Sequence, residues 1–516
     1  MKPVLLACAF VAVLAAAAPA HGRPSSNVAW LDAAADVDVD RALAQARSAH
    51  EPLLLYWGAR WCPPCNQLEA TLFNRQDFAL LAKSFVAVHI DGDRPGAQKL
   101  GQRFKVSAYP TLLLLASGGN EITRLPGAAE PAQVLALMQA GLAGGRPVKD
   151  LLADARAGKK LAAEAWRELA FYSWDTDEGQ VLPKSALAAT LVDLAVACPA
   201  SEAETSNRLW LKALAASGEG RGVKADARLR QRVLALLADP AQARAQADLI
   251  SAEAPHIVGV LVADDARARP ALIGAFDAVL RRFAADASLS RADRIAALRA
   301  RVDLARLDQP DAALRVRLPA PVLRDLRAEV RRADLEIRNG YERQAVIPEA
   351  AFALDRAGLW RESDALLKAN LAKSAAPYYL MSALGANARR LGHKAEALGW
   401  YRRAYSTSVG ASTRLQWGAD YLEALVELAP ADTGAIESTA IALMTEAGRD
   451  GDAFDGRSAL ALQRMGRSLL AWRGGTPARA ALARLRPRLE ALCTGIDVAG
   501  RQRADCRGLL GPRPAA

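Results

Sequence analysis

The chain has 516 residues, of which 52% are hydrophobic and only 6% aromatic, so its apolar content consists mainly of Ala, Leu and Val. This length allows roughly two to four domains, and this composition favours helices. The net charge of +11 arises from 67 basic and 56 acidic residues spread along the whole sequence. Because no basic stripe with interleaved aromatic residues is present, we expect no nucleic-acid binding.

The first 20 residues have the pattern of a secretory signal peptide. Lys2 supplies the positive charge, an apolar segment runs from Val4 to Ala17, and Ala18-Pro19-Ala20 is a small-residue cleavage site. A lipoprotein signal ending at Cys8 is less favoured, because too few apolar residues precede that cysteine. No later run reaches the ~20 apolar residues that a membrane helix needs. We therefore expect a soluble protein that is exported to the periplasm or another oxidising compartment and does not span a membrane.

Strand and helix patterns alternate between residues 28 and 143. Parallel strands joined by helices and followed by a terminal hairpin predict a compact α/β domain. In chain order we expect a helix (36–50), a strand (53–59), a long helix (66–83), a strand (85–90), a short helix (97–104), two strands (111–116 and 121–125) joined by a hairpin turn, and a closing helix (131–142).

The motif Trp61-Cys62-Pro63-Pro64-Cys65 lies where the first expected strand gives way to a helix. Unpaired N–H groups and the positive end of the helix dipole favour a thiolate at such a position. Cys62 is placed to attack the disulfide of a partner, and Cys65, about one helical turn later, is placed to resolve the mixed disulfide. The two prolines fit the first helical positions and leave the Cys65 N–H as the nearest backbone donor to the Cys62 sulfur.

A second signal is Tyr109-Pro110-Thr111, directly before an expected strand. A cis peptide bond at Pro110 would turn the backbone toward the two cysteines. On its own this is an ordinary loop proline, but its distance from the cysteine pair makes the combination specific.

Residues 28 to 143 resemble a thioredoxin-fold domain, and the most similar family we can name is the C-terminal domain of the membrane thiol:disulfide interchange protein DsbD and its exported relatives. The resemblance implies that Cys62 is the nucleophile, that Cys65 is the resolving thiol, and that Pro110 is a cis-proline in a peptide groove lined by Trp61 and Tyr109. We expect no cofactor. The residues that carry it are Trp57, Trp61-Cys62-Pro63-Pro64-Cys65, Leu68-Glu69, Phe73, Val106, Tyr109-Pro110-Thr111 and Gly127.

The chain departs from the thioredoxin pattern at Tyr56. Thioredoxins have a buried acid six residues before the first cysteine, and that acid exchanges a proton with the second cysteine. The interchange-protein domain also has a glutamate four residues after its second cysteine, matched here by Glu69. Glu69 lies one turn beyond Cys65 on the same helix face, so we hypothesise that it relays the proton. The alternative is a solvated helix glutamate without a role.

After a short linker at Gly144-Gly145-Arg146-Pro147, residues 148–506 have apolar positions at helical spacing and predict an all-helical region. Leu384-Gly385 with Gly392 and Tyr401 repeats the spacing of Ala350-Ala351 with Gly358 and Leu367, displaced by 34 residues. This spacing resembles the tetratricopeptide (TPR) repeat, which predicts a curved stack of helix pairs. A generic helical bundle is the alternative. Residues 507–516 are expected to form a flexible tail.

Six cysteines are present, and five remain after signal cleavage. In an exported protein we expect a structural disulfide between Cys493 and Cys506. Cys198 ends an apolar helical run and reads as a buried core thiol. The five histidines have no ligand spacing, and we predict no metal site.

The sequence therefore predicts an exported thiol:disulfide oxidoreductase whose helical region binds a protein partner or substrate. Its partners would be protein thiols and disulfides. The resemblance favours the reductase direction, which requires a membrane electron donor. The alternative is a repeat scaffold or chaperone-like binding protein in which the thioredoxin-like domain serves mainly for docking.

Overall fold

The computed structural model describes residues 28–125, 127, 130–174, 176–218, 221–495 and 500–511. The predicted signal peptide (1–20) and the last residues of the predicted tail (512–516) lie outside this part of the chain. Within it, no helix combines the length and the apolar character that crossing a membrane requires.

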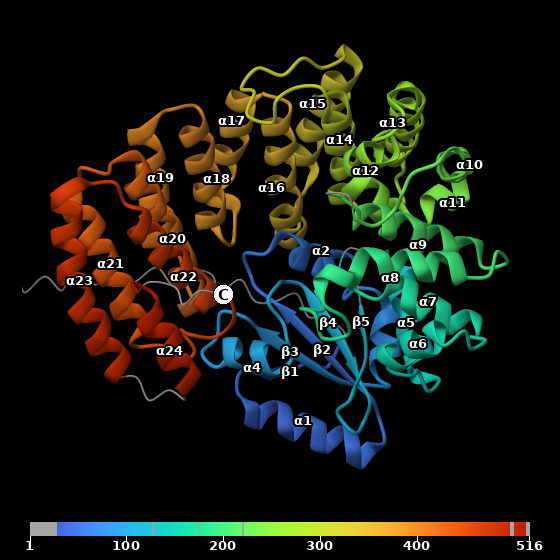
Figure 1. The fold of residues 1–516 in the computed structure, drawn as a ribbon, viewed down its shortest axis with the longest axis horizontal. Coiled ribbons are helices and arrows are strands. Elements are labelled where there is room, and N and C mark those ends of the chain that lie inside the picture. The colour runs from blue at the N-terminus through green and yellow to red at the C-terminus, as the bar shows by residue number, and fades with distance from the viewer. Residues whose placement is uncertain are drawn as a thin grey trace, which may run out of the picture.

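A mixed five-stranded sheet forms the centre of the N-terminal part (Figure 1). Its strands lie in the order β1-β3-β2-β4-β5, with β1 and β2 parallel to β3, and β4 antiparallel to both β2 and β5. Every residue of β2 is buried, as the continuous apolar run predicts for a central strand. The strands are β1 Leu31–Ala33, β2 Leu53–Gly58, β3 Val86–Asp91, β4 Thr111–Leu115 and β5 Glu121–Leu125.

Five helices accompany this sheet, and they differ from the prediction at one place. They are α1 Asp36–Ala49, α2 Pro63–Thr71, α3 Gln76–Ala82, α4 Ala97–Arg103 and α5 Pro131–Leu142. The expected single helix over residues 66–83 is in fact two helices. The chain turns after α2, and this turn lets Phe73 pack against Tyr56, with 4.7 Å between the ring centroids. Strand β1 was not predicted, because three residues give no alternating pattern.

All further elements of the described chain are helical. The α-helices are α6 Val148–Arg156, α7 Ala163–Phe171, α8 Lys184–Ala197, α9 Ala203–Ala215, α10 Ala227–Ala238, α11 Pro240–Arg244, α12 Ala247–Leu261, α13 Arg269–Ala285, α14 Arg291–Ala305, α15 Ala320–Glu336, α16 Gly340–Arg356, α17 Trp360–Asn370, α18 Pro377–Arg390, α19 Lys394–Thr407, α20 Ala411–Leu428, α21 Thr433–Ala447, α22 Gly456–Ala471, α23 Gly475–Gly495 and α24 Gly500–Gly508. Short 3-10 turns lie at Ala266–Ala268 and Leu371–Lys373.

These helices form an arc around the sheet (Figure 1). The arc starts beside α5, passes over α2, where α16 packs against it, and continues to α22, which packs against α4. The arc thus crosses the end of the sheet that carries the cysteine motif.

The segment with the repeated spacing forms successive packed helices from α16 to α21. Gly358 and Gly392 both follow a helix and have φ angles of 73° and 78°, a conformation that glycine adopts without strain. Gly385 lies against the Tyr401 ring, where an added Cβ atom would approach within 3.1 Å. The small residues at these positions therefore permit close helix packing. Their assignment to the TPR family stays a prediction.

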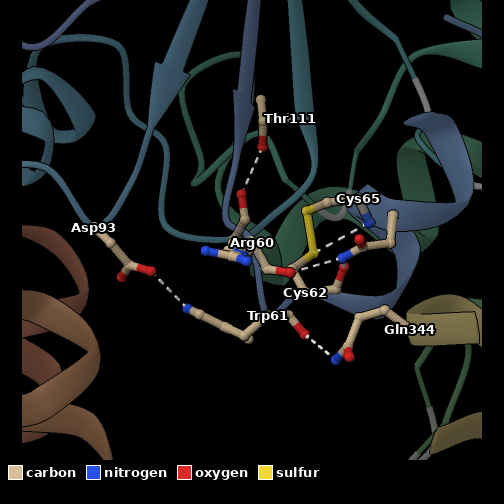
Figure 2. Close-up of a disulfide and its surroundings, with 9 residues drawn as sticks. Arg60, Trp61, Cys62, Cys65, Asp93, Thr111 and Gln344 are labelled. Atoms are coloured by element: carbon tan, nitrogen blue, oxygen red, sulfur yellow. Dashed lines mark hydrogen bonds between the residues drawn. A yellow bond between two sulfur atoms is a disulfide. The ribbon is translucent and has the colours of Figure 1, made fainter. Parts of the chain in front are cut away.

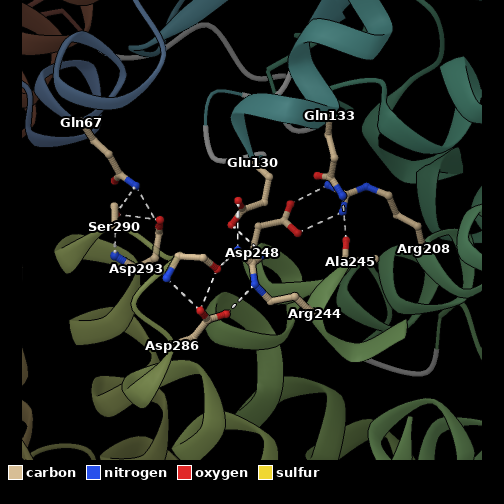
Figure 3. A network of polar contacts seen from close by, with 11 residues as sticks. Gln67, Glu130, Gln133, Arg208, Arg244, Ala245, Asp248, Asp286, Ser290 and Asp293 are labelled. Carbon is tan, nitrogen blue, oxygen red and sulfur yellow. Dashed lines mark hydrogen bonds and ion pairs between the residues drawn. The ribbon is translucent and has the colours of Figure 1, made fainter. Parts of the chain in front are cut away.

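A polar network fastens the arc to the sheet domain on the side of α5 (Figure 3). Glu130 and Asp286 both pair with Arg244, at 3.1 and 2.8 Å. Gln133 of α5 donates to the carbonyl of Ala245 at 2.8 Å. These contacts join residues far apart in sequence, so the two parts of the chain pack as one body here.

Two remaining cysteine predictions concern the helical region. Cys493 of α23 and Cys506 of α24 form a disulfide, and both are fully buried. Cys198 is a buried free thiol, and its burial raises its pKa to about 11. A flexible tail was expected over residues 507–516, but Leu509 and Leu510 are buried in the core of the last helices. These two leucines pack against the last helices, a contact that the Gly- and Pro-rich composition of the segment does not indicate.

Removing the Cys493–Cys506 disulfide should destabilise the last two helices. The bridge closes a short loop, for which the loss of chain entropy on closure is worth about 3 kcal/mol. In Cys493→Ser/Cys506→Ser we expect faster amide hydrogen exchange in α23 and α24, with exchange in the sheet unchanged. Equal protection of α23 in both proteins would show that packing alone holds these helices.

A candidate redox site under the helical arc

The two cysteines of the motif occupy the first turn of α2 and form a disulfide (Figure 2). Cys62 is the N-cap residue, Pro63 and Pro64 follow it, and the Cys65 N–H donates to the Cys62 sulfur at 3.2 Å. The buried Asn66 side chain donates to the carbonyls of Arg60 and Cys62, at 2.9 and 2.8 Å. The helix N-terminus and the donated hydrogen bond both favour a thiolate on Cys62 after reduction.

The peptide bond between Tyr109 and Pro110 is cis. The Tyr109 ring lies beside the Trp61 ring, with 6.2 Å between their centroids. Thr111, the first residue of β4, hydrogen-bonds the Ala108 carbonyl at 2.8 Å and holds this loop (Figure 2). The fold therefore brings Tyr109 next to Trp61 and the cysteine pair, although Tyr109 lies about 45 residues later in the sequence.

The motif is buried, although a reactive cysteine is ordinarily partly exposed. Cys62 and Cys65 are each 2% exposed and Trp61 is 7% exposed. They belong to one apolar cluster with residues of the helical arc, including Tyr378, Met381 and Trp417. The sequence did not reveal this cover, because helical periodicity shows which face of a helix is apolar but not which surface that face meets.

Trp61 is hydrogen-bonded at both ends. Its indole Nε1–H donates to Asp93 at 3.0 Å, and its carbonyl accepts from Gln344 of α16 at 3.1 Å (Figure 2). The Thr413 hydroxyl of α20 donates to the other carboxylate oxygen of Asp93. Asp93 and Gln344 are thus site residues that sequence reasoning missed. In the sequence, Asp93 belongs to an acidic turn, Asp91-Gly92-Asp93, which indicates no contact with Trp61, and no motif includes Gln344.

A cavity of about 580 Å³ lies behind the second cysteine. Cys65, Glu69 and Tyr56 all line it, together with His89. The Tyr56 side chain is 1% exposed and packs in the core, whereas Glu69 is half-buried. The structure therefore places Glu69 and Cys65 in the lining of one cavity, and the residue at position 56 is a tyrosine with no acidic group. In the described chain, no cluster of His, Cys, Asp and Glu has the geometry of a metal site.

The Asp93 carboxyl group has a pKa raised to about 7, chiefly because its burial disfavours the charged form. Nearby Asp91 raises the pKa further, while the hydrogen bonds from Thr413 and Trp61 and the charge of Arg457 lower it. The folded state therefore favours the protonated acid. The protonated Asp93 therefore contributes to the free energy of unfolding. That contribution is fully present below the ordinary pKa of 3.8 and is lost as the pH rises through 7.

We predict that Asp93→Asn removes this pH dependence, because the amide can accept from Trp61 and donate to Thr413 without a charge. From pH 4 to pH 8 the wild type should lose on the order of 3 kcal/mol of unfolding free energy relative to the variant. Denaturant unfolding followed by tryptophan fluorescence at several pH values measures this difference. Two curves that stay parallel over this range would contradict the assignment.

Comparison with known proteins bears on this site. A family model for the thioredoxin-like domain matches residues 39–142. The chain is 31% identical over 102 residues to thiol:disulfide interchange protein DsbD 1 of Pseudomonas aeruginosa, covering 19% of this chain and 17% of that protein. It is 28% identical over 120 residues to DsbD 2 of the same organism, covering 22% and 20% of the two chains. It is 27% identical over 124 residues to DsbD of Klebsiella pneumoniae, covering 23% and 20%.

The chain thus spans one fifth or less of the length of these relatives, and the similarity falls on the thioredoxin region. The strand order, the disulfide within the Cys-Pro-Pro-Cys motif and the cis peptide bond at Pro110 agree with that similarity. Residues 39–142 of this chain form a thioredoxin-like domain similar to the DsbD proteins, and a large all-helical region follows it.

Proposed function

We propose that this chain is an exported thiol:disulfide oxidoreductase in which Cys62 and Cys65 exchange a disulfide for two thiols with partner proteins. The observation that carries the proposal is the Cys62–Cys65 disulfide at the N-terminus of α2, next to the cis peptide bond at Pro110. Similarity to proteins named for thiol:disulfide interchange supports the same chemistry.

In the reductive direction the dithiol supplies two electrons to the disulfide of a partner. The Cys62 thiolate attacks one partner sulfur, a mixed disulfide forms, and the other partner sulfur leaves as a thiolate that takes up a proton. Cys65 then loses its proton and attacks the Cys62 sulfur. This step restores the Cys62–Cys65 disulfide and releases the second partner thiolate.

The similarity to DsbD favours this reductive direction and a place in the periplasm. A protein dithiol supplied from the membrane would then return the Cys62–Cys65 pair to its reduced form. We propose that the helical region binds the protein partner or substrate, because such an arc offers a long surface for another chain.

A second candidate function is a binding scaffold in which the thioredoxin-like domain only docks. The 2% exposure of Cys62 favours it, because a buried sulfur cannot meet a partner disulfide. The intact cysteine pair and the cis peptide bond at Pro110 favour exchange instead.

Turnover of a disulfide substrate separates the two functions. With dithiothreitol as reductant, Cys62→Ser should reduce insulin disulfides at least about 100-fold more slowly than the wild type, because the attacking sulfur is gone. Cys198→Ser, which makes the same substitution at a cysteine outside the motif, is the control and should reduce insulin at the wild-type rate. Equal rates for wild type and Cys62→Ser, with insulin and also with short disulfide-linked peptides, would contradict the oxidoreductase function and favour the binding scaffold. Cys65→Ser should accumulate mixed disulfides in cells, which mass spectrometry can identify.

We propose that Glu69 accepts the Cys65 proton and later returns it. A carboxylate in the cavity behind Cys65 can act as this base, whereas the phenol of Tyr56 is a poor acceptor near neutral pH.

In Glu69→Gln we expect the exchange rate at pH 7 to fall about tenfold or more, with a changed pH profile. Glu51→Gln serves as the control. A profile identical to that of the wild type would remove Glu69 from the mechanism.

A further inference from the structure

Three side chains of the helical arc contact the Trp61 ring, and one of them also contacts the Tyr109 ring. Tyr379 of α18 stacks on the indole, with 6.1 Å between centroids and 18° between planes. Trp417 of α20 meets it edge-on at 5.3 Å. The guanidinium of Arg457, from α22, lies 4.9 Å from the Trp61 and Tyr109 ring centroids alike. We call these three side chains the aromatic cap.

Polar contacts fix the position of this cap. The side-chain amide of Gln98, on α4, makes two of these contacts. Its N–H₂ group donates to the Tyr109 hydroxyl at 2.9 Å, and its oxygen accepts from the Arg457 backbone N–H at 2.7 Å. The Trp417 indole donates to the Tyr378 carbonyl at 3.0 Å. These hydrogen bonds fix the direction of the Trp417 ring and the position of the Arg457 backbone.

The cap has a chemical consequence for Cys62. A thiolate must approach the partner disulfide closely, so the polypeptide next to that disulfide has to lie along Trp61 and the Tyr109–Pro110 loop. The aromatic cap covers the Trp61 part of this surface, and Arg457 also covers the Tyr109 ring. A partner protein therefore has to displace the cap before its disulfide can meet Cys62.

We propose that the aromatic cap determines which disulfides this site accepts: it fills the peptide groove, and exchange occurs only with a partner whose own side chains replace it. This inference rests on the proposed oxidoreductase function.

The contacts that a partner must replace define its chemistry. Opening the cap exposes the Trp61 and Tyr109 rings, which a partner aromatic ring and an arginine can cover again. Displacing Trp417 moves α20, and this movement also removes the Thr413 hydroxyl of the same helix from Asp93, for which a partner donor can substitute. We therefore expect substrate segments that carry an aromatic and a basic residue beside the cysteine. Segments with acidic or glycine residues there should be poor substrates.

The first test opens the cap without touching the cysteines or Trp61. In Tyr379→Ala/Arg457→Gln, alkylation of reduced Cys62 by a polymer-linked maleimide should become at least about tenfold faster, and insulin reduction should rise in parallel. Trp360→Ala/Arg484→Gln, which changes the same kinds of residue elsewhere in the arc, should behave as the wild type. Thr413→Val is a milder variant that removes only the hydroxyl contact with Asp93, and it should change the rates in the same direction.

The outcomes distinguish the cap from the proposed function. Thermal unfolding is first compared, so that only proteins of equal stability are used. If Cys62 of the wild type then reacts with the bulky reagent as fast as Cys62 of both variants, the cap does not close the site. Faster alkylation in the variants with no disulfide turnover by any of the proteins would uphold the closure and overturn the oxidoreductase function.

The second test concerns selectivity and uses short synthetic peptides joined by a disulfide. The wild type should reduce peptides with Trp and Arg next to the cysteine at least about tenfold faster than peptides with Gly and Asp there, and the double variant should lose most of this preference. Equal rates for both peptides with the wild type would overturn the substrate assignment.

Discussion

The packing of the helical arc onto Trp61 is the contact on which the properties of this site depend. Trp61 is held by Asp93 from the sheet domain and by Gln344 from α16, and the rings of Tyr379 and Trp417 cover it. Burying large aromatic side chains contributes strongly to an interface, and the hydrogen bonds at both ends of Trp61 fix its direction. This single residue therefore couples the environment of the disulfide to the position of the helices.

The same contact reconciles two observations that otherwise oppose each other. The cysteine pair has the location that thiol exchange requires, at a helix N-terminus beside a cis peptide bond. Yet both cysteines are only 2% exposed. A closed state with a complete redox centre inside it resolves the conflict, because opening changes access while the arrangement of the two thiols stays the same. Selectivity for substrates then arises from the cost of opening, which only a complementary partner can offset.

How far the sequence could predict this molecule depended on whether each feature is local. The cysteine motif, strands β2 to β5 and the closing helix α5 have local signatures, and the structure agrees with them closely. Strand β1 is too short for a pattern, and the break between α2 and α3 depends on where Phe73 packs. The cover over Cys62 depends on contacts between residues more than 280 positions apart, such as Gln344 with Trp61. No local spacing encodes such a contact, so Asp93, Gln344 and Arg457 emerged only from the fold.

Hydrogen exchange on a trapped mixed disulfide shows whether the helical cover must open before Cys62 reacts. In Cys65→Ser joined through Cys62 to an aromatic and basic substrate peptide, we expect faster amide exchange in α20 and α22 than in the free protein, with exchange in β2 and β3 unchanged. A mixed disulfide that forms at Cys62 while α20 and α22 keep their full protection would contradict it, because the thiol would then have reacted without displacement of the helical cover.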